Sequence, residues 1–576
     1  MKDEFGRIRG FGSRRHYCYN SPTYHKETAT IVSKIASHYK DNPNVIAWQV
    51  DNEIGCQDTV YCYCDNCLNA FREWLKNKYC SINEVNRAWG TVFWSQTYRS
   101  WDEVILPSYT VCETDSEHRF THNPGMLLDF YRFSSDSAAA YQNLQVDVLR
   151  KAGCMQPITH NFMGNFPDID YFKLGKELDF ISWDNYPNLQ WGKSTYTSVA
   201  IAHDTMRGIK NKNFWVVEQQ SGPCGWSVLG DTPKPGQLRL WTYQAVAHGA
   251  EAIVYFRWRA CTFGTEEYWY GILDHDGIPR KRYREIQKTG SELKKLSELA
   301  VNSEFAAEAA LIKSYDNLWS HRFQPHNRGF DYTRHLTAYY EALADNDINV
   351  DVTTENADLT SYKLILMPAF NLMNDRIKKK LEDYVNQGGT LVITFRSGTK
   401  NWDNSMTTET LPGYFRELAG VEVEEFDSLN WGRQVKVTAA SGEGTASIWC
   451  DILKPSGAEV LMKYGSEFYC GKPAVTENSY GKGKVYYIGC DLNREALAML
   501  MKHIAGKSGV NPILPVHIEG IEAVKRVKDG KTYLMILNHN GYGVSVNLEG
   551  SYTELITGTA VKKVLNREPY GGAILE

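Results

Sequence analysis

Five short apolar runs, separated by longer helical patterns, constrain the fold of the first half of this chain more than any other feature. The runs span residues 45–50, 157–161, 178–183, 214–217 and 252–257. Helical patterns at residues 126–151 and 237–248 lie between them. Short buried strands that alternate with helices are typical of βαβ units and of a parallel sheet. The sequence therefore predicts an α/β domain in this half of the chain.

Several of these predicted strands end in a cluster of polar side chains. Residues 51–53, 184–186 and 218–220 read Asp-Asn-Glu, Asp-Asn-Tyr and Glu-Gln-Gln, and each follows an apolar run. Active sites of (β/α)8 TIM barrels are built at the carboxyl ends of the strands, where such clusters converge. Because eight strands close such a barrel and only five can be counted, we predict an incomplete (β/α)8 TIM barrel.

The rest of the chain carries two further patterns. Strands at residues 362–368 and 390–394 flank a helix at residues 375–386, as in a flavodoxin-like open sheet. After about residue 512 the pattern changes to alternating strands joined by turn residues, which is typical of antiparallel β structure. We therefore predict three domains, namely a barrel over residues 1–305, a flavodoxin-like α/β domain over 306–511 and a small antiparallel β domain over 512–576.

Two glutamates stand at the ends of predicted barrel strands. Glu53 follows the run at residues 45–50, and Glu218 follows the run at residues 214–217. Cleavage of a glycosidic bond needs two carboxyl groups that flank it, one to donate a proton and one to attack or to activate water. Either glutamate alone could equally be a surface or capping residue. Their separation in strand order favours a catalytic pair.

The cysteines form a second signal. Thirteen cysteines are present, and Cys62, Cys64 and Cys67 are spaced closely enough to converge on one tetrahedral metal ion, with Cys18 as a distant fourth ligand. Four protein ligands leave no open position, so such a metal would be structural. An unmetallated thiol cluster is the alternative, and Cys56 lies near enough in the sequence to compete as a ligand.

Charge and hydropathy exclude several other classes of protein. The formal net charge is −5 and no long Lys/Arg block is present, so a zinc-dependent nucleic-acid binder, suggested by the cysteines alone, is disfavoured. No apolar run approaches the ~20 residues that span a bilayer. The start of the sequence has no apolar core of a signal peptide. We expect a cytoplasmic protein with no membrane or nucleic-acid partner.

Four motifs resemble the family forty-two β-galactosidases, which are retaining glycosidases with (β/α)8 barrels. They are residues 14–18 (Arg-Arg-His-Tyr-Cys), 49–53 (Gln-Val-Asp-Asn-Glu), 62–67 (Cys-Tyr-Cys-Asp-Asn-Cys) and 89–94 (Trp-Gly-Thr-Val-Phe-Trp). The resemblance implies a retaining exo-β-galactosidase that releases terminal galactose from galactosides or oligosaccharides without an organic cofactor. It also implies a homotrimer assembled through the middle domain.

The resemblance assigns roles to individual residues. Glu53 matches the general acid/base and Glu218 the nucleophile. Trp94 matches a residue that reaches into the neighbouring subunit's pocket. The remaining matches line the galactose subsite or bind the structural zinc ion, and they are Arg14, Asn52, Tyr186, Trp226 and Glu266 for the sugar and Cys18, Cys62, Cys64 and Cys67 for zinc.

Two departures from the family pattern lead to alternatives. Trp269 stands where the family has a histidine that helps to hold the axial hydroxyl of galactose, so an α-L-arabinopyranosidase is one alternative. The family's barrel begins well upstream of Met1, which implies that the amino-terminal part of the barrel is lacking. Unpaired edge strands destabilise a barrel, and an inactive carbohydrate-binding homologue is therefore the second alternative.

Overall fold

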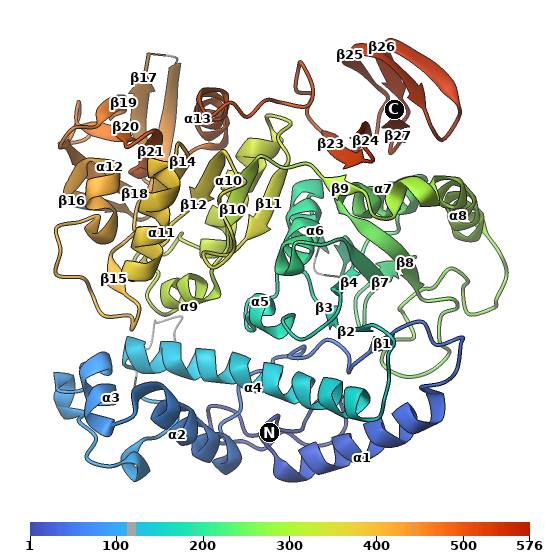
Figure 1. Ribbon diagram of the computed structural model, residues 1–576, viewed down its shortest axis with the longest axis horizontal. Coiled ribbons are helices and arrows are strands. Elements are labelled where there is room, and N and C mark those ends of the chain that lie inside the picture. The colour runs from blue at the N-terminus through green and yellow to red at the C-terminus, as the bar shows by residue number, and fades with distance from the viewer. Residues whose placement is uncertain (112–121, 191, 441) are drawn as a thin grey trace.

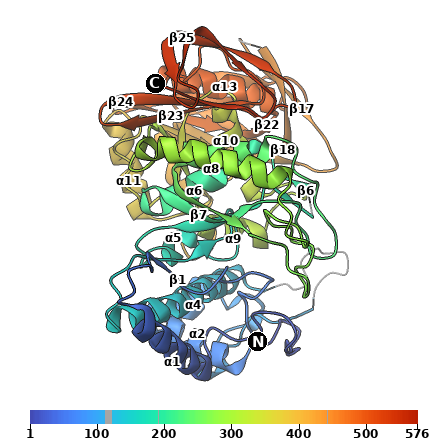
Figure 2. The same ribbon diagram turned by 90° about the vertical axis from the view of Figure 1, so that its right-hand side faces the viewer.

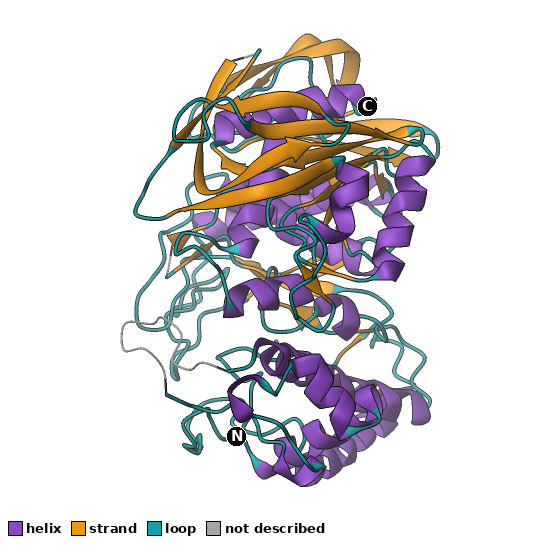
Figure 3. Ribbon diagram, turned by 90° about the vertical axis from the view of Figure 1, so that its left-hand side faces the viewer, coloured by secondary structure: helices purple, strands orange, loops and turns teal. Residues whose placement is uncertain are grey.

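The computed structural model describes residues 1–111, 122–190, 192–440 and 442–576, and its main sheets follow one another along the chain (Figure 1). Helices α1 (Pro22–Tyr39), α2 (Asp65–Tyr79) and α4 (Pro124–Lys151) lie together at the amino-terminal end of the molecule. The carboxyl-terminal sheet lies at the opposite end (Figure 2). Figure 3 shows that the strands gather away from the amino-terminal helices.

The first sheet is parallel and barrel-like. β1 (Trp48–Gln49) pairs with β2 (Ile158–Thr159), and one residue later the same chain segment continues as β3 (Asn161–Phe162). β3 is followed across the sheet by β4 (Ser182–Asn185), β7 (Phe214–Gln220) and β8 (Ala250–Phe256). These strands occupy the positions of the five apolar runs. The predicted TIM-barrel-like class of the domain is confirmed.

Helices pack against this sheet and connect its parallel strands. α4 begins at Asn123, whose side chain accepts hydrogen bonds from the backbone N–H groups of Gly125 and Met126, with Pro124 at the first helical position. Such a cap followed by proline is a strong helix start. α6 (Tyr196–Lys210) and α7 (Gln237–His248) follow β4 and β7 along the chain. Since all five strand positions run parallel, their carboxyl ends share one edge of the sheet.

The second sheet combines a parallel part and an antiparallel part. Its parallel strands follow the order 2-1-3-4-5 of flavodoxin-like folds, and all four residues of β12 are buried. These strands are, across the sheet, β11 (Val350–Thr353), β10 (Ala309–Ile312), β12 (Leu364–Met367), β14 (Thr390–Thr394) and β21 (Gly483–Ile488). The flavodoxin-like prediction is confirmed for this part.

The antiparallel extension of the same sheet was not predicted from the sequence. Beyond β21 the sheet continues through β20 (Pro473–Tyr480), β19 (Glu459–Tyr464), β17 (Val435–Ala439), β18 (Gly442–Pro455) and β16 (Val421–Leu429). Helix α10 (Tyr332–Ala344) and helix α13 (Arg494–Lys507) pack beside one another in the same region. The long sequence between β14 and β21 is therefore a sheet extension.

The last sheet is antiparallel and joins the barrel-like part directly. β9 (Glu304–Phe305), which follows helix α8 (Lys281–Ala300), pairs with β23 (Ile521–Lys528). The other strands are β24 (Lys531–Asn538), β27 (Gly572–Leu575), β25 (Val544–Glu554) and β26 (Thr559–Arg567). Apolar residues of α7 and α8 form one core cluster with this sheet. None of the helices in the described ranges has the length and apolar character that crossing a membrane requires.

Candidate active site

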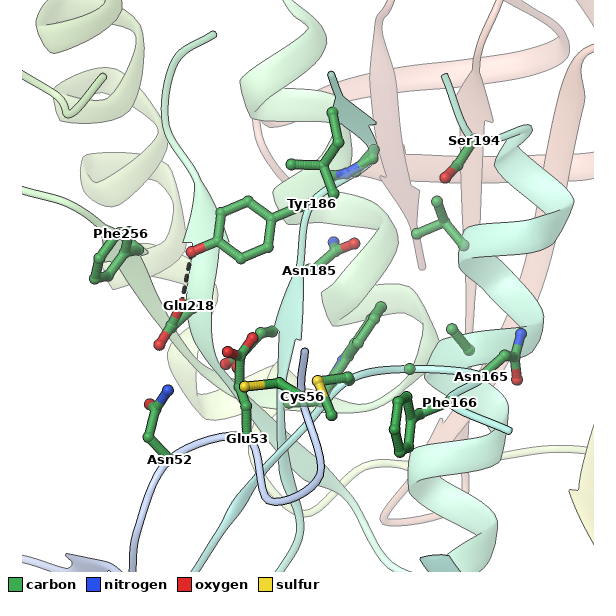
Figure 4. Close-up of a pocket in the computed structure, with 18 of the residues that line it drawn as sticks. Asn52, Glu53, Cys56, Asn165, Phe166, Asn185, Tyr186, Ser194, Glu218 and Phe256 are labelled. Carbon is green, nitrogen blue, oxygen red and sulfur yellow. Dashed lines mark hydrogen bonds between the residues drawn. The ribbon is translucent and has the colours of Figure 1, made fainter. Parts of the chain in front are cut away.

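A cavity of about 770 Å³ lies at the carboxyl ends of the barrel-like strands (Figure 4). Glu53 comes from the loop after β1, and Glu218 comes from β7. The cavity is lined by all but one of the residues predicted for catalysis and sugar binding, namely Arg14, Asn52, Glu53, Tyr186, Glu218, Trp226, Glu266 and Trp269. Segments distant in the sequence therefore meet at the predicted edge of the sheet.

Glu53 and Glu218 face one another across the cavity. Each offers a carboxylate oxygen that lies within 4.8 Å of the other and of an oxygen of Asp184. Two carboxyl groups about 5–5.5 Å apart are typical of retaining glycosidases, whereas inverting enzymes separate them further to admit a water molecule. The spacing favours direct attack by one of the two glutamates.

The carboxyl group of Glu218 is buried beside a hydroxyl donor. Burial raises the pKa of Glu218, the Tyr186 hydrogen bond opposes this, and the charge of Glu53 adds to the rise, which brings the pKa to about 7. Tyr186 Oη donates to Glu218 Oε2 over 2.6 Å. A hydrogen bond to the ionised form favours that form, so Tyr186 supports a negative charge on Glu218 in a site that otherwise disfavours one.

The backbone around Glu53 is strained and held by partners from other strands. Both Asp51, with φ of 56°, and Glu53, with φ of 40°, are in the left-handed region, which costs a residue other than glycine about 1–3 kcal/mol. The Glu53 N–H donates to Asn161 Oδ1 over 2.9 Å. Arg14 Nη2 donates to Glu53 Oε2 over 2.9 Å. The loop is thus fixed through both its backbone and the side chain of Glu53.

His160 closes the same loop from the neighbouring strand. Its Nδ1 lies 2.8 Å from the Val50 carbonyl oxygen, and its Nε2 lies 3.1 Å from the Ile54 N–H. These two contacts are satisfied together only by a neutral ring that donates from Nδ1 and accepts at Nε2. Burial lowers the pKa of His160 to about 4, which agrees with the neutral form.

Aromatic rings form one wall of the cavity. The rings of Tyr186 and Trp269 are 5.1 Å apart and nearly perpendicular, and Trp226 lies 6.0 Å from Trp269. Arg257 Nη2 donates to Glu266 Oε2 over 3.0 Å, which orients this carboxylate at the rim. Aromatic faces beside fixed polar groups suit a ligand with both apolar and hydroxyl-bearing faces, as a sugar has.

The four predicted metal ligands also come together. The sulfur atoms of Cys18, Cys62, Cys64 and Cys67 all lie within 4.8 Å of one another, with 3.3 Å between Cys18 and Cys67. A tetrahedral zinc ion with Zn–S bonds of about 2.3 Å spaces its sulfurs about 3.8 Å apart. An all-thiol donor set of this size fits zinc. Cys56 is not part of the group and lines the cavity instead.

Three family models of β-galactosidases match successive parts of the chain. The model described as β-galactosidase matches residues 1–296, the β-galactosidase trimerisation domain matches 307–511 and the β-galactosidase C-terminal domain matches 520–576. The chain belongs to this β-galactosidase family.

Individual relatives agree with the family matches. The β-galactosidase BgaP of Planococcus sp. (strain L4) is 36% identical over 583 residues, which cover all of this chain and 85% of that protein. The β-galactosidase bgaB of Geobacillus kaustophilus is 35% identical, over 96% of this chain and 82% of that protein. The crystal structure of a β-galactosidase from Bacillus circulans sp. alkalophilus is 35% identical and superposes with a TM-score of 0.94, over all of this chain and 85% of that one.

One expectation drawn from the family resemblance requires correction. The family match runs from residue 1 onward, and the prediction that the chain lacks the amino-terminal part of the barrel is not borne out. That prediction rested on where the family's barrel begins relative to Met1 and on the count of only five apolar runs. Such runs find strands by their burial, and they do not measure how much of a family's domain a chain represents.

Trp94 is the predicted site residue that does not line this cavity. It lies in the short 3-10 helix η1 (Phe93–Ser95) and is 70% exposed. Its neighbours Val92 and Phe93 are also exposed. An exposed tryptophan away from the cavity of its own chain is compatible with the role that the family resemblance implied.

Three residues of the site were given no role from the sequence. Asn161 Nδ2 lies 2.8 Å from Asn52 Oδ1, 2.6 Å from Asp184 Oδ2 and 3.5 Å from Glu218 Oε1. His160 and Asp184 are the other two. Asp184 begins the cluster at residues 184–186, and His160 and Asn161 are the last two residues of the run at 157–161, so the rule that selected Glu53 and Glu218 could also have selected them.

Proposed function

We propose that this cavity is the active site of a retaining exo-β-galactosidase, in which Glu218 is the nucleophile and Glu53 is the general acid/base. Membership of the family carries the activity itself, the hydrolysis of terminal β-D-galactose by double displacement. The observation that supports double displacement here is the short separation of the Glu53 and Glu218 carboxylates, and the family resemblance supplies which of the two is the nucleophile.

The geometry suggests how the two steps are divided. In the first step Glu218 attacks the anomeric carbon while Glu53 protonates the departing glycosidic oxygen. In the second step Glu53 removes a proton from water, which attacks the glycosyl-enzyme ester and releases the sugar. Because Glu53 and Glu218 lie close together, the protonation state of each depends on the charge of the other. The Tyr186 hydrogen bond directs the charge toward Glu218. Two carboxyls suffice for this chemistry, so no organic cofactor is required.

The polar and aromatic residues of the cavity are the proposed determinants of sugar specificity. We place Arg14, Asn52 and Glu266 as partners of the sugar hydroxyls, and Tyr186, Trp226 and Trp269 as the aromatic wall. Trp269 supplies an indole N–H where the family has a histidine, so an α-L-arabinopyranosidase is the second candidate. Comparing the hydrolysis of nitrophenyl β-D-galactopyranoside and nitrophenyl α-L-arabinopyranoside separates the two, because the second sugar lacks only the substituent at C5.

The catalytic assignment can be tested through the stereochemistry of the product. Glu218→Ala should lose nearly all hydrolysis, and added azide should restore a slow reaction that gives the α-galactosyl azide. Glu267→Ala is the matched control, since Glu267 neighbours the cavity residue Glu266 and is exposed. If proton NMR of the first-formed sugar shows inversion by the unmodified protein, the assignment is wrong.

We also propose that Cys18, Cys62, Cys64 and Cys67 hold one structural zinc ion. Cys64 caps the start of α2 and Cys67 lies in its first turn, while Cys18 comes from the segment before α1. A metal bound there would tie two helices and their loops together. Elemental analysis should find about one zinc per chain, reduced in Cys64→Ser and unchanged in Cys80→Ser, which alters an exposed cysteine outside the cluster. An intact protein without zinc, purified without chelator, would reject this site.

The family matches and the cysteines also bear on the assembly and the cellular location of this protein. We propose a homotrimer, supported by the match of residues 307–511 to a trimerisation domain, with Trp94 reaching a neighbour's cavity. We also propose domain limits at 1–305, 306–511 and 512–576, supported by the three successive family matches. The described cysteines are free thiols, which favours a reducing compartment such as the cytoplasm.

The assembly can be tested by light scattering and one substitution. A trimeric mass is expected in solution. Trp94→Ala should lower kcat/KM without dissociating the trimer. Met155→Ala, which removes another highly exposed apolar side chain and lies outside residues 307–511, should leave both unchanged. A fully active monomer would contradict this part of the proposal.

A further inference from the structure

Asp184 is a third carboxyl group at the centre of the catalytic cavity. It lies on β4 directly opposite Glu218 of β7 in the strand register. Its side chain lines the cavity and the residue is only 6% exposed. One oxygen, Oδ2, accepts from Asn161 Nδ2 over 2.6 Å. The other, Oδ1, is buried and has no hydrogen-bond partner within the described part of the chain.

Asp184 has no cationic partner among the residues that the structure describes. In the described ranges, Arg14 pairs with Glu53 and Arg257 pairs with Glu266, and no ion pair reaches Asp184. The groups that face it are the carboxyls of Glu53 and Glu218, the amide of Asn161, and the phenols of Tyr171 and Tyr186. Each of these groups is neutral or negative.

Three carboxyls so close together cannot all be ionised. Like charges a few ångströms apart in a buried site keep at least one proton bound among them. Burial raises the pKa of Asp184 well above its ordinary value, and the charges of Glu218 and Glu53 raise it further. Glu218 accepts a hydrogen bond from the Tyr186 hydroxyl, and Glu53 accepts one from the Arg14 guanidinium. Asp184 has only an amide N–H.

Resting on the proposed function, we infer that Asp184 is a positioning residue that works in its neutral, protonated form. It accepts from Asn161 through one oxygen and carries its proton on the other. Asn161 in turn accepts the Glu53 N–H and contacts Glu218. A neutral Asp184 therefore orients the amide that connects both catalytic residues, without adding a second negative charge beside the nucleophile.

This form makes Asp184→Asn the informative substitution. An asparagine has the shape of a protonated aspartic acid, retains an oxygen that accepts from Asn161, and replaces the O–H donor by an N–H donor. It should therefore preserve kcat/KM within about threefold and leave the pH profile unshifted. Asp184→Ala removes the acceptor of Asn161 and should lower kcat by about 10²-fold, because small misplacements of catalytic groups cost this much.

The decisive measurement pairs the pH profile with infrared spectroscopy of the intact protein. At neutral pH the difference spectrum between the unmodified protein and Asp184→Asn should show the C=O band of one protonated carboxylic acid that the variant lacks, while bands of other buried acids such as Glu355 cancel. A large loss of kcat in Asp184→Asn with an unchanged thermal midpoint would show that its charge is required and would overturn the inference. A difference spectrum without such a band would overturn it equally.

The outcome is separable from that of the proposed function. If Asp184→Ala does not fold, the Asp184→Asn profile and the infrared band still decide the inference. If Glu218→Ala keeps its activity, the proposed function fails, whereas the protonation of Asp184 is still settled by the infrared band.

Discussion

Two buried groups of carboxyls in this molecule have opposite surroundings. In the catalytic cavity, Glu53, Asp184 and Glu218 face one another. Elsewhere, His248 at the end of α7 lies between two carboxyls, with Nδ1 2.7 Å from Asp204 Oδ1 and Nε2 3.0 Å from Glu522 Oε1. We call the second group, with Asp204, His248 and Glu522 at its centre, the His248 junction.

The two groups shift pKa values in opposite directions. Burial would raise the pKa of both Asp204 and Glu522, but Arg207 and His248 at the first and His248 and His539 at the second keep them below their usual range. In the cavity, burial raises the pKa of Glu218 to about 7. The two groups of carboxyls therefore do not differ in pKa because of how deeply they are buried. Cationic partners fix the charge at the junction, while their scarcity in the cavity leaves a proton available for chemistry.

The His248 junction also connects the main parts of the fold. Asp204 comes from α6 and Glu522 from β23 of the carboxyl-terminal sheet. Tyr340 of α10 donates to Asp204 Oδ2 over 2.6 Å, and Arg207 of α6 pairs with Asp351 over 2.7 Å. We therefore expect substitutions at the junction to affect stability, and substitutions in the cavity to affect turnover.

Glu218→Gln should show the largest difference between its effect on turnover and its effect on stability. Loss of the proposed nucleophile should reduce kcat by at least about 10⁴-fold. The thermal midpoint should stay the same or rise, because a crowded carboxylate is removed from a buried site. Calorimetry beside a standard kinetic assay measures both. A midpoint lowered by several degrees would mean that the cavity also holds the fold together.

The converse is expected for Glu522→Gln at the junction. Leaving the cationic partners of a buried pair uncompensated should cost about 3–5 kcal/mol of unfolding free energy. Activity per folded molecule should be unchanged, since Glu522 does not line the cavity. Denaturant unfolding is the measurement, and Glu519→Gln, at an exposed site, is the control. Equal stability of the two variants would show that Glu522 stabilises the fold no more than an exposed glutamate does.

The junction should also show its charge in the pH dependence of stability. Burial alone would lower the pKa of His248, but Asp204 and Glu522 raise it from 6.5 to about 9. A cation with a raised pKa stabilises the fold fully below its unfolded value, and this contribution is lost as the pH rises through about 9. About 3 kcal/mol should be lost over this range. His248→Gln should lack this step in its unfolding profile, and retention of the step would assign it to another group.

The smallest effect is expected for Tyr186→Phe in the cavity. Without the hydroxyl, Glu218 loses the hydrogen bond that lowers its pKa. The limb of the kcat/KM profile that reports ionisation of the nucleophile should move to higher pH by about one unit, since a hydrogen bond to a charged group contributes about 1.5–3 kcal/mol. Stability at neutral pH should change little. An unshifted limb would exclude Tyr186 as a determinant of this ionisation.

The parallel strands were predictable because burial on both faces makes them continuous apolar runs. The antiparallel extension from β16 to β20 was missed because its strands are exposed on one face and are interrupted by bulges, as between Val423 and Glu425. Such strands alternate and carry a weaker signal.

Within the site, the glutamates were predictable and their supports were not. Glu53 and Glu218 each follow an apolar run, which is a local property of the sequence. The contact between Glu53 and Asn161 joins residues 108 positions apart. The positive φ angles of Asp51 and Glu53 occur at residues that are not glycine, so no local composition reveals them. Their roles exist only after the strands have been brought together.

The neutral ring of His160 sets the order in which acid would disable this protein. Its Nε2 can accept the Ile54 N–H only while it is unprotonated. As the pH falls through about 4, the added proton would place two donors against one another at the strained turn that presents Glu53. The carboxylates of the His248 junction, with their lowered pKa values, would still be paired at that pH. Acid inactivation should therefore begin as a local, reversible loosening of one catalytic loop, before the molecule as a whole unfolds.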